Sequence, residues 1–201
     1  CGSSMRTSIS VARLVPCLLL ASLFAAAPSR ATEIEVRIDD PQGREILDGR
    51  VILAISRTEQ FNVSSVTNAS QLFGVSVEEL ANGGSVRVDA ASRGYPLRSL
   101  AEVPAGEYWV KAWLNVYRTF ERADGHVVKL PMDYGDGQTW HEKPGNLVSE
   151  PVRLRIDPED DGVVRVTLNE ALPAIEPPAE TAWVKNFEIV SERASEFWGT
   201  E

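Results

Sequence analysis

The sequence predicts an all-β protein built as an antiparallel β-sandwich. Two observations carry this prediction: apolar and polar residues alternate in several short runs, and turns rich in glycine and proline separate these runs. Alternation with a period of two places every second side chain on the same face of a strand. Short strands between such turns, with almost no helical periodicity, are typical of two packed antiparallel sheets. We also expect long loop insertions between some of the strands.

Several runs show the alternation clearly, and in each one the apolar residues define the face expected in the core. These residues are Ile34, Val36 and Ile38; Val51, Leu53 and Ile55; Tyr108, Val110, Ala112, Leu114 and Val116; Val152, Leu154 and Ile156; and Val164, Val166 and Leu168. The sequence PAGEY at 104–108 stands before the longest run. Such a sequence commonly opens a late strand of immunoglobulin-like modules, so we expect the sandwich to be immunoglobulin-like.

The first 31 residues have the features of an export signal. A basic stretch precedes an apolar run at 14–27, and small residues precede a cleavage position before Thr32. This is the pattern of a secretory signal peptide, and the run is shorter than the ~20 apolar residues of a membrane-spanning helix. We expect a signal-peptide helix that is cleaved, and a periplasmic or extracellular protein. Residues 1–4, before Met5, are interpreted as a cloning scar or an over-extended gene start.

Charge and cysteine content limit the classes of function. The net charge is −9, and because the leader holds three arginines and no acid, its removal leaves −12. A domain this acidic repels nucleic acid and anionic lipid. We therefore expect no nucleic-acid partner and no membrane association after signal cleavage. Both cysteines, Cys1 and Cys17, fall in the leader, so the mature domain has neither a disulfide nor a cysteine nucleophile.

The chain is expected to divide into four segments. These are a leader at 1–31, a β-sandwich domain at 32–170, a Pro-rich linker at 171–182, and the start of a further domain at 183–201. Closely spaced prolines favour an extended, semi-rigid linker. The run from Trp183 to Val190 is strand-like and predicts the first strand of that further domain.

Two long connections interrupt the sandwich pattern. One covers residues 57–103 and contains a segment near 77–80 that is compatible with a short helix; the other covers residues 131–149 and is rich in glycine, aspartate and aromatics. Long structured loops on a rigid scaffold are where binding residues concentrate.

An ordered set of motifs between residues 34 and 199 resembles the N-terminal region of large secreted bacterial esterases. The motifs are FGV at 73–75, GYPLRSL at 94–100, AGEY at 105–108, LNVY at 114–117, RADGH at 122–126, MD at 132–133, GQ at 137–138, PGN at 144–146, EPP at 176–178 and FWG at 197–199. In that family a β-sandwich domain precedes an α/β-hydrolase domain of the esterase D type, which the FWG motif introduces. The resemblance implies a non-catalytic accessory or interface domain, with the hydrolase domain as its covalent partner and absent from this chain.

The residues present do not form a recognisable catalytic motif. A serine hydrolase needs a nucleophile on a strained turn, commonly Gly-x-Ser-x-Gly. The nearest sequence is Gly74-Val-Ser76-Val-Glu78, which lacks the second glycine. The two histidines, His126 and His141, have the spacing of no standard metal-ligand motif. We therefore predict that this chain is not an enzyme.

Aromatic residues are the candidates for ligand binding, which would make the chain a stand-alone carbohydrate- or peptide-binding module. They are Trp109, Trp113 and Tyr117, which share the strand face opposite the aliphatic row, and Tyr134 and Trp140, which lie in the second long connection. An exposed aromatic row can stack on sugar rings. The interpretation that we favour is that this face packs against residues 57–103 or against a following domain.

Acidic loops are the candidates for metal binding. Asp133 and Asp136 stand in the sequence DYGDG, which is oxygen-rich and bent by glycine, and residues 157–162 are similar. Calcium takes about six to eight oxygen ligands, and neither segment follows the EF-hand order. Ordinary acidic turns are the alternative interpretation. We expect no cofactor, with calcium at Asp133 and Asp136 as the candidate exception.

Overall fold

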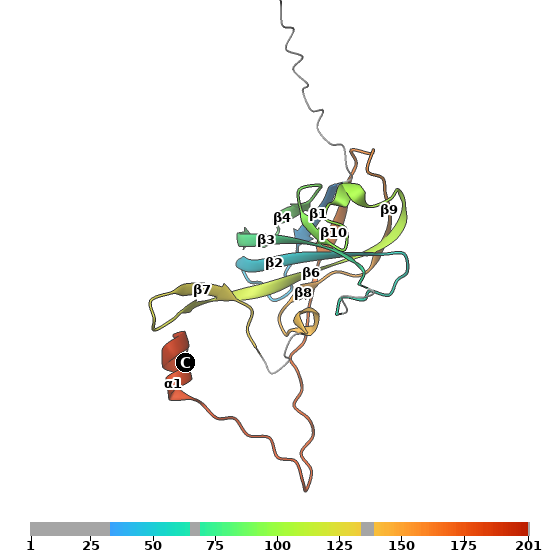
Figure 1. Ribbon diagram of the computed structural model, residues 1–201. Coiled ribbons are helices and arrows are strands. Elements are labelled where there is room, and N and C mark those ends of the chain that lie inside the picture. The colour runs from blue at the N-terminus through green and yellow to red at the C-terminus, as the bar shows by residue number, and fades with distance from the viewer. Residues whose placement is uncertain (1–32, 65–68, 134–138, 201) are drawn as a thin grey trace, which may run out of the picture.

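A computed structural model describes residues 33–64, 69–133 and 139–200. The expected leader lies outside these residues, so the signal peptide and its cleavage position stay predictions. The elements, in chain order, are β1 (Glu33–Ile38), β2 (Ile46–Ser56), β3 (Gln71–Ala81), β4 (Ser85–Val88), β5 (Arg93–Tyr95), the short 3-10 helix η1 (Leu100–Glu102), β6 (Gly106–Glu121), β7 (Val127–Leu130), the 3-10 helix η2 (Trp140–Glu142), β8 (Leu147–Val148), β9 (Val152–Ile156), β10 (Val163–Leu168), β11 (Glu170–Ala171) and α1 (Glu192–Trp198). Figure 1 shows the strands packed together and a long C-terminal segment that leaves them.

The strands form two sheets, which confirms the predicted all-β, sandwich-like fold. The smaller sheet has the order β10-β1-β4, and the larger has the order β11-β8-β6-β2-β3-β5, with β7 and β9 also paired to β6. Strand β2 lies along one side of β6, while β9, β8 and β7 pair in turn along its other side. Strand β6 therefore collects, on one edge, segments from distant parts of the sequence.

One strand pair differs from the antiparallel expectation. Strand β1 runs parallel to β10, with Ile34 opposite Val164 and Ile38 opposite Leu168. Alternation shows which face of a strand a residue takes, but it says nothing about the direction of the neighbouring strand.

The core lies between the two sheets and contains the faces that alternation predicts. Its buried members include Ile34, Val36 and Ile38 of β1, Val51, Leu53 and Ile55 of β2, Tyr108, Val110, Ala112 and Leu114 of β6, Leu154 and Ile156 of β9, and Val166 and Leu168 of β10. Val152 is the exposed exception, at the first position of β9. Phe73 and Leu100, for which alternation assigned no face, are fully buried as well.

The start of β6 has a feature of immunoglobulin domains. The Tyr108 hydroxyl donates a hydrogen bond of 2.7 Å to the carbonyl oxygen of Pro104, four residues upstream. A tyrosine that bonds back to the upstream backbone in this way is the tyrosine corner of such domains. The Arg57 guanidinium carbon lies 4.1 Å from the Tyr108 ring centroid and covers the ring. The geometry supports the immunoglobulin-like interpretation of the PAGEY sequence.

The first long connection contains more structure than the sequence suggests. Strands β3, β4 and β5 all lie within residues 57–103, and the short helix expected near 77–80 is wrong because β3 occupies these residues. Strand β3 pairs with β2 over almost its whole length, with a register shift between Leu47 and Gly49. Its apolar row, Phe73, Val75 and Val77, is short, and the alternation ends at Glu79, which has a φ of 50°. The register shift in the pairing with β2 falls at the same place.

The run from Trp183 to Val190, expected to be the first strand of a further domain, pairs with no strand of the sandwich. These residues form no strand and are exposed, and the next element is helix α1. The Ser191 hydroxyl accepts a hydrogen bond from the Ala194 N–H at the start of α1, and Gly199 ends the helix in the left-handed region with a φ of 63°. An alternating sequence becomes a strand only where a sheet edge offers it hydrogen-bond partners.

Candidate functional site

The predicted aromatic row is covered at its centre. Trp113 is only 5% exposed, and its ring makes edge-to-face contacts with Phe61 at 6.2 Å and with Trp140 at 5.9 Å between ring centroids. Ala54, Val148, Val63, Leu72 and Leu172 pack into the same cluster. This small second core lies on the outer face of the larger sheet, where the favoured interpretation placed packing against residues 57–103.

The other aromatic candidates are distributed around this cluster. Trp109 and Tyr117 are half-buried on the two sides of Trp113 along β6, so the three rings do not form a continuous exposed platform. Trp140 belongs to η2 and also contacts His141, with ring centroids 5.4 Å apart. Tyr134 lies outside the described residues.

Buried Asn146 holds this arrangement together. Its side-chain oxygen accepts the N–H of Val116, while its side-chain nitrogen donates to the carbonyl oxygen of Trp140 at 2.7 Å and to Asn115 at 3.2 Å. A buried amide that meets several backbone groups fixes the loop against the strand. Asn146 thus attaches η2 to β6 and positions Trp140 over Trp113.

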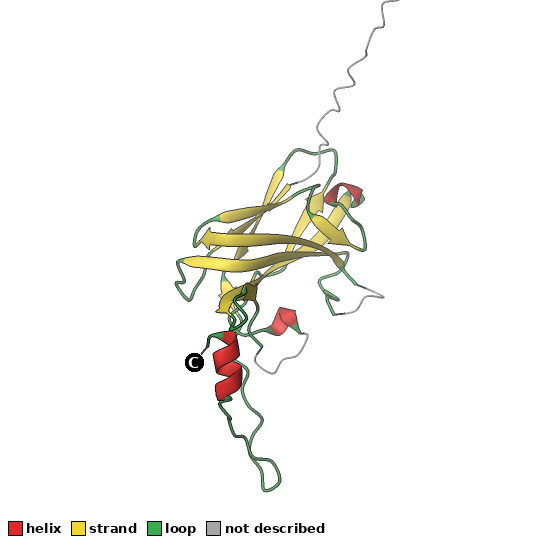
Figure 2. Cartoon of the chain, turned by 60° about the vertical axis from the view of Figure 1, so that its left-hand side comes forward, coloured by secondary structure: helices red, strands yellow, loops and turns green. Residues whose placement is uncertain are grey.

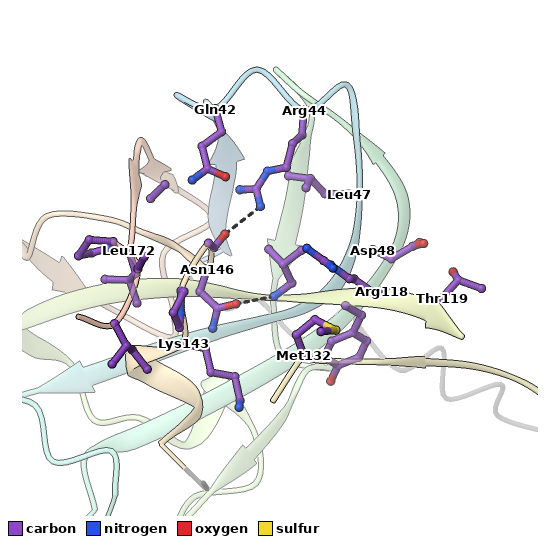
Figure 3. Close-up of a pocket in the computed structure, with 18 of the residues that line it drawn as sticks. Gln42, Arg44, Leu47, Asp48, Arg118, Thr119, Met132, Lys143, Asn146 and Leu172 are labelled. Carbon is purple, nitrogen blue, oxygen red and sulfur yellow. Dashed lines mark hydrogen bonds between the residues drawn. The ribbon is translucent and has the colours of Figure 1, made fainter. Parts of the chain in front are cut away.

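A cavity of about 1050 Å³ lies next to this junction, between the ends of β2 and β6 and the chain that follows β11. Figure 3 shows Arg44, Arg118 and Lys143 around it, with Met132 and Leu172 among its apolar walls. Residues 173–178, which include three prolines, form another wall. The Pro-rich segment is therefore an edge of the cavity and not merely a tether.

Arg44 is fixed in the wall of this cavity by a buried carboxylate. Its Nε lies 2.6 Å from Asp40 Oδ2, and its Nη1 donates to the carbonyl oxygen of Gly145. Burial raises the pKa of the Asp40 carboxyl, but the bonds from Arg44 and from the Gln42 N–H outweigh this, so the pKa lies below its ordinary value. The pair joins the β1–β2 turn to the segment before β8.

The candidate metal residues are not brought together. Asp133 is exposed, and Asp136 lies outside the described residues. Within the residues that the structure describes, no group of three or more His, Cys, Asp and Glu side chains is close enough to hold a metal ion. In the segment 157–162, Asp157 and Asp160 accept backbone N–H groups two residues ahead, which is how acidic turns are stabilised.

The remaining polar candidates are separate from one another. Ser76 lies in the middle of β3, where its hydroxyl is 3.0 Å from Arg50 Nη1, and not on a strained turn. His126 pairs with Asp124 in the β6–β7 turn, and His141 lies beside Glu142 in η2. These elements place the two histidines in different loops.

The FWG motif docks onto the β6–β7 hairpin, and sequence reasoning missed this contact. The Trp198 ring packs edge-to-face on Phe120 at 5.7 Å, and the Arg122 guanidinium carbon lies 4.9 Å from the Phe197 ring centroid. The Ala123 N–H donates to the Phe197 carbonyl oxygen at 2.8 Å. We call Phe120, Arg122, Phe197, Trp198 and Gly199 the aromatic clasp.

The position of Gly199 shows how close the clasp is. A side-chain carbon at this residue would lie 2.5 Å from the Glu121 carbonyl oxygen, which is closer than real contacts allow. Only glycine combines this approach with the left-handed backbone conformation that Gly199 adopts. The glycine of the FWG motif therefore allows the end of α1 to pack closely against the β6–β7 hairpin.

The chain between the sandwich and the clasp is held at both ends. We call residues 173–191 the C-terminal loop. At its start, the Leu172 N–H donates to Asn146 and the Leu172 carbonyl accepts from Gly145; beyond its end, α1 is held by the clasp. Figure 2 shows the loop running away from the sheets, turning, and returning to α1 beside them. In this chain the expected linker at 171–182 and the run at 183–190 thus form one loop between Leu172 and α1.

The tip of this loop is ordered by hydrogen bonds. The Thr181 hydroxyl oxygen accepts the N–H groups of Trp183 and Val184, and the Thr181 N–H donates to the Val184 carbonyl. Glu180 accepts from Lys185 Nζ at 2.7 Å and from the Asn186 N–H. The bond from Lys185, followed by the bond from Asn186, lowers the pKa of the Glu180 carboxyl.

Apolar side chains of the C-terminal loop are nevertheless in water. Trp183 is 95% exposed, Phe187 78% and Ile189 79%. Val184 and Val190 are exposed as well. Large apolar side chains gathered in one exposed segment mark interaction surfaces in proteins. The loop is therefore the strongest candidate site on the described part of the molecule.

No protein-family model, curated protein or solved structure matches this chain. Among the residues that the structure describes, no helix has the length and apolar character needed to cross a membrane. The esterase resemblance thus stays a prediction from sequence motifs.

Proposed function

We propose that this chain is a non-catalytic accessory domain of a secreted esterase-like protein, and that it holds a following hydrolase domain against the side of the sandwich that carries the C-terminal loop. The observation that carries the proposal is the aromatic clasp. It joins two motifs of the resemblance, RADGH and FWG, which are distant in sequence. In the family, the FWG motif introduces the hydrolase domain. Contact between this motif and the sandwich would therefore fix the position of the domain that follows.

The geometry of the clasp suits this role. Its contacts combine ring packing, a cation–π contact and a backbone hydrogen bond, each of which has a directional preference. Directional contacts at the end of α1 define an orientation, whereas a free Pro-rich linker would define only a distance. The domain is expected to orient its neighbour rather than to act on a substrate itself.

Two measurements test the proposal. We expect the gene to continue in frame beyond Glu201 into a hydrolase sequence. We also expect purified residues 32–201 to hydrolyse a p-nitrophenyl ester no faster than buffer does. A stop codon at residue 202 in independent genomic clones would contradict the accessory role. Turnover that is abolished by Ser76→Ala would contradict the non-catalytic assignment.

A glycan-binding screen addresses the alternative of a stand-alone carbohydrate- or peptide-binding module. Because Trp113 is covered, stacking on the aromatic row would depend on half-buried Trp109 and Tyr117. We expect no glycan binding. Binding that is lost on Trp109→Ala, with the fold retained by circular dichroism, would favour the alternative.

A further inference from the structure

We infer that the C-terminal loop is a docking surface for a protein domain whose contact face is apolar at its centre and rich in Lys and Arg at its rim. The inference rests on the proposed function, since the loop lies on the side to which the following domain would attach, and it adds the chemistry of the partner surface. Three properties of the loop lead to it: order without burial, the kind of side chains exposed, and the sign of the charge.

Order without burial is the first property. Apolar side chains normally become ordered because they leave water. In this loop the order comes from the bonds of Glu180 and Thr181 and from the anchors at Leu172 and the clasp, while Trp183 stays almost fully exposed. A preorganised loop loses little conformational entropy when a partner covers it. The hydrogen bonds thus hold apolar side chains ready for contact.

The exposed side chains are the second property. Trp183 lies within the turn that Glu180 closes by its bonds to Lys185 and Asn186, and Phe187 follows this turn directly. Aromatic residues dominate the binding energy of protein interfaces when they enter an apolar pocket on the partner. Ile189 and Val190, in the part of the loop that returns to α1, are exposed as well. These side chains need an apolar area opposite them.

Charge is the third property, and it selects among possible occupants. Within the C-terminal loop the sequence holds three glutamates against Lys185, a net charge of −2. Lys185 is already paired with Glu180. An acidic rim attracts a basic surface and repels a like-charged one. A second copy of this chain, at −12 without its leader, and an anionic membrane are both disfavoured, which leaves a basic protein surface.

The test uses peptides of defined chemistry and the chain at residues 32–201. Two synthetic amphipathic helical peptides share the same leucine face, and one carries lysines and the other glutamates on its polar face. Fluorescence anisotropy measures their binding to the wild type, to the loop variant Phe187→Ser/Ile189→Ser, and to the control variant Val152→Ser/Val163→Ser. The control removes two exposed apolar side chains from β9 and β10, and circular dichroism verifies that both variants fold.

We expect the lysine peptide to bind the wild type, to bind the loop variant about tenfold or more weakly, and to bind the control variant unchanged. Raised salt should weaken the binding, because the rim contacts are ionic. Equal binding of both peptides, equal binding to both variants, or no binding overturns the inference. Loop-dependent dimerisation in sedimentation, or loop-dependent binding to phosphatidylcholine–phosphatidylglycerol vesicles, would assign the loop to another occupant and overturns it too.

These outcomes separate the inference from the proposed function. If the gene continues into a hydrolase while the loop variant binds the lysine peptide as the wild type does, only the inference on the loop fails. If the loop selects the lysine peptide while the reading frame stops at residue 202, the accessory role is contradicted and the inference that the loop is a docking surface still holds.

Discussion

The β-sandwich and the C-terminal loop reach a defined structure in opposite ways. In the sandwich, large apolar side chains such as Phe73 are fully buried, and burial of each contributes about 1.5–3 kcal/mol. In the loop, Phe187 and Trp183 are exposed, and hydrogen bonds and two anchors provide the order. Order alone therefore does not identify a core. Apolar side chains that are ordered but unburied retain their free energy of burial for a partner.

The largest expected effect comes from making the same substitution in both regions. We expect Phe73→Ala to lower the free energy of unfolding by about 3–5 kcal/mol, because it opens a cavity in the core beside Gly94. Phe187→Ala should change the free energy of unfolding by less than about 0.5 kcal/mol, because this ring is exposed and its removal opens no cavity. Urea unfolding of the two variants measures the difference. A comparable loss in Phe187→Ala would mean that the loop belongs to the core.

A second effect concerns the buried charge pair at the base of the sandwich. We expect Asp40→Asn to cost about 1–3 kcal/mol at neutral pH, because it removes a carboxylate that binds Arg44 and two backbone N–H groups. The pKa of Asp40 is lower in the folded state than its ordinary value of 3.8, so the unfolded state binds its proton more readily. The stabilisation is therefore complete above that value and is lost as the pH falls through the folded pKa.

Urea unfolding at several pH values checks this prediction. The gap in unfolding free energy between wild type and Asp40→Asn should narrow as the pH falls below 3.8. Exposed Glu45→Gln is the matched control and should change stability little at any pH. A gap that stays constant into the acid range would show that the charge of Asp40 is not what stabilises the fold.

A third, smaller effect concerns the tyrosine corner. We expect Tyr108→Phe to cost about 0.5–1.5 kcal/mol, because it removes one hydrogen bond and leaves the ring in place. Tyr117→Phe, on the outer face of the same strand, should cost less. Thermal melts of the two variants compare them. If Tyr117→Phe proves the more costly, the Tyr108 hydrogen bond contributes no more to stability than an ordinary tyrosine hydroxyl on the outer face.

The smallest effect on global stability, but the clearest local one, is expected at the clasp. Trp198→Ala removes the contact with Phe120 at a partly exposed position, so the loss of unfolding free energy should stay below about 1.5 kcal/mol. The C-terminal loop, however, loses its second anchor. Trypsin should then cleave after Lys185 and Arg193 faster than in the wild type, whereas Val190→Ala should leave the cleavage rate unchanged. Equal rates in both variants would show that the clasp does not hold the loop.

The sequence predicts the strands with strict alternation and misses those whose pattern is interrupted. The inward row of β6 is correct because a long run of alternating residues has only one face that can be buried. Strand β3 is missed because its apolar row, Phe73, Val75 and Val77, is short and two consecutive glutamates interrupt the alternation after it. The C-terminal run at 183–190 alternates as well, yet no sheet edge pairs with it. Alternation shows that a segment can form a strand, and the availability of a partner strand determines whether it does.

The candidate site is likewise predicted only in part, because the contacts between distant segments are not visible in the sequence. The sequence identifies the aromatics of β6 but not that Phe61 and Trp140 cover Trp113. It contains the motifs at 122–126 and 197–199 without any indication that they meet. Arginine and aromatic rings commonly form cation–π contacts, but the sequence does not say which arginine meets which ring.

By itself, the sequence determined that the protein is all-β, which face of each main strand is apolar, and that the chain is acidic. These properties are local or additive, so they can be read residue by residue. Only the tertiary structure shows that β1 runs parallel to β10, that Phe61 and Trp140 are the rings that cover Trp113, and that the clasp closes a Pro-rich segment into a loop. Each of these depends on which distant segments come together, and that is determined only when the whole core forms.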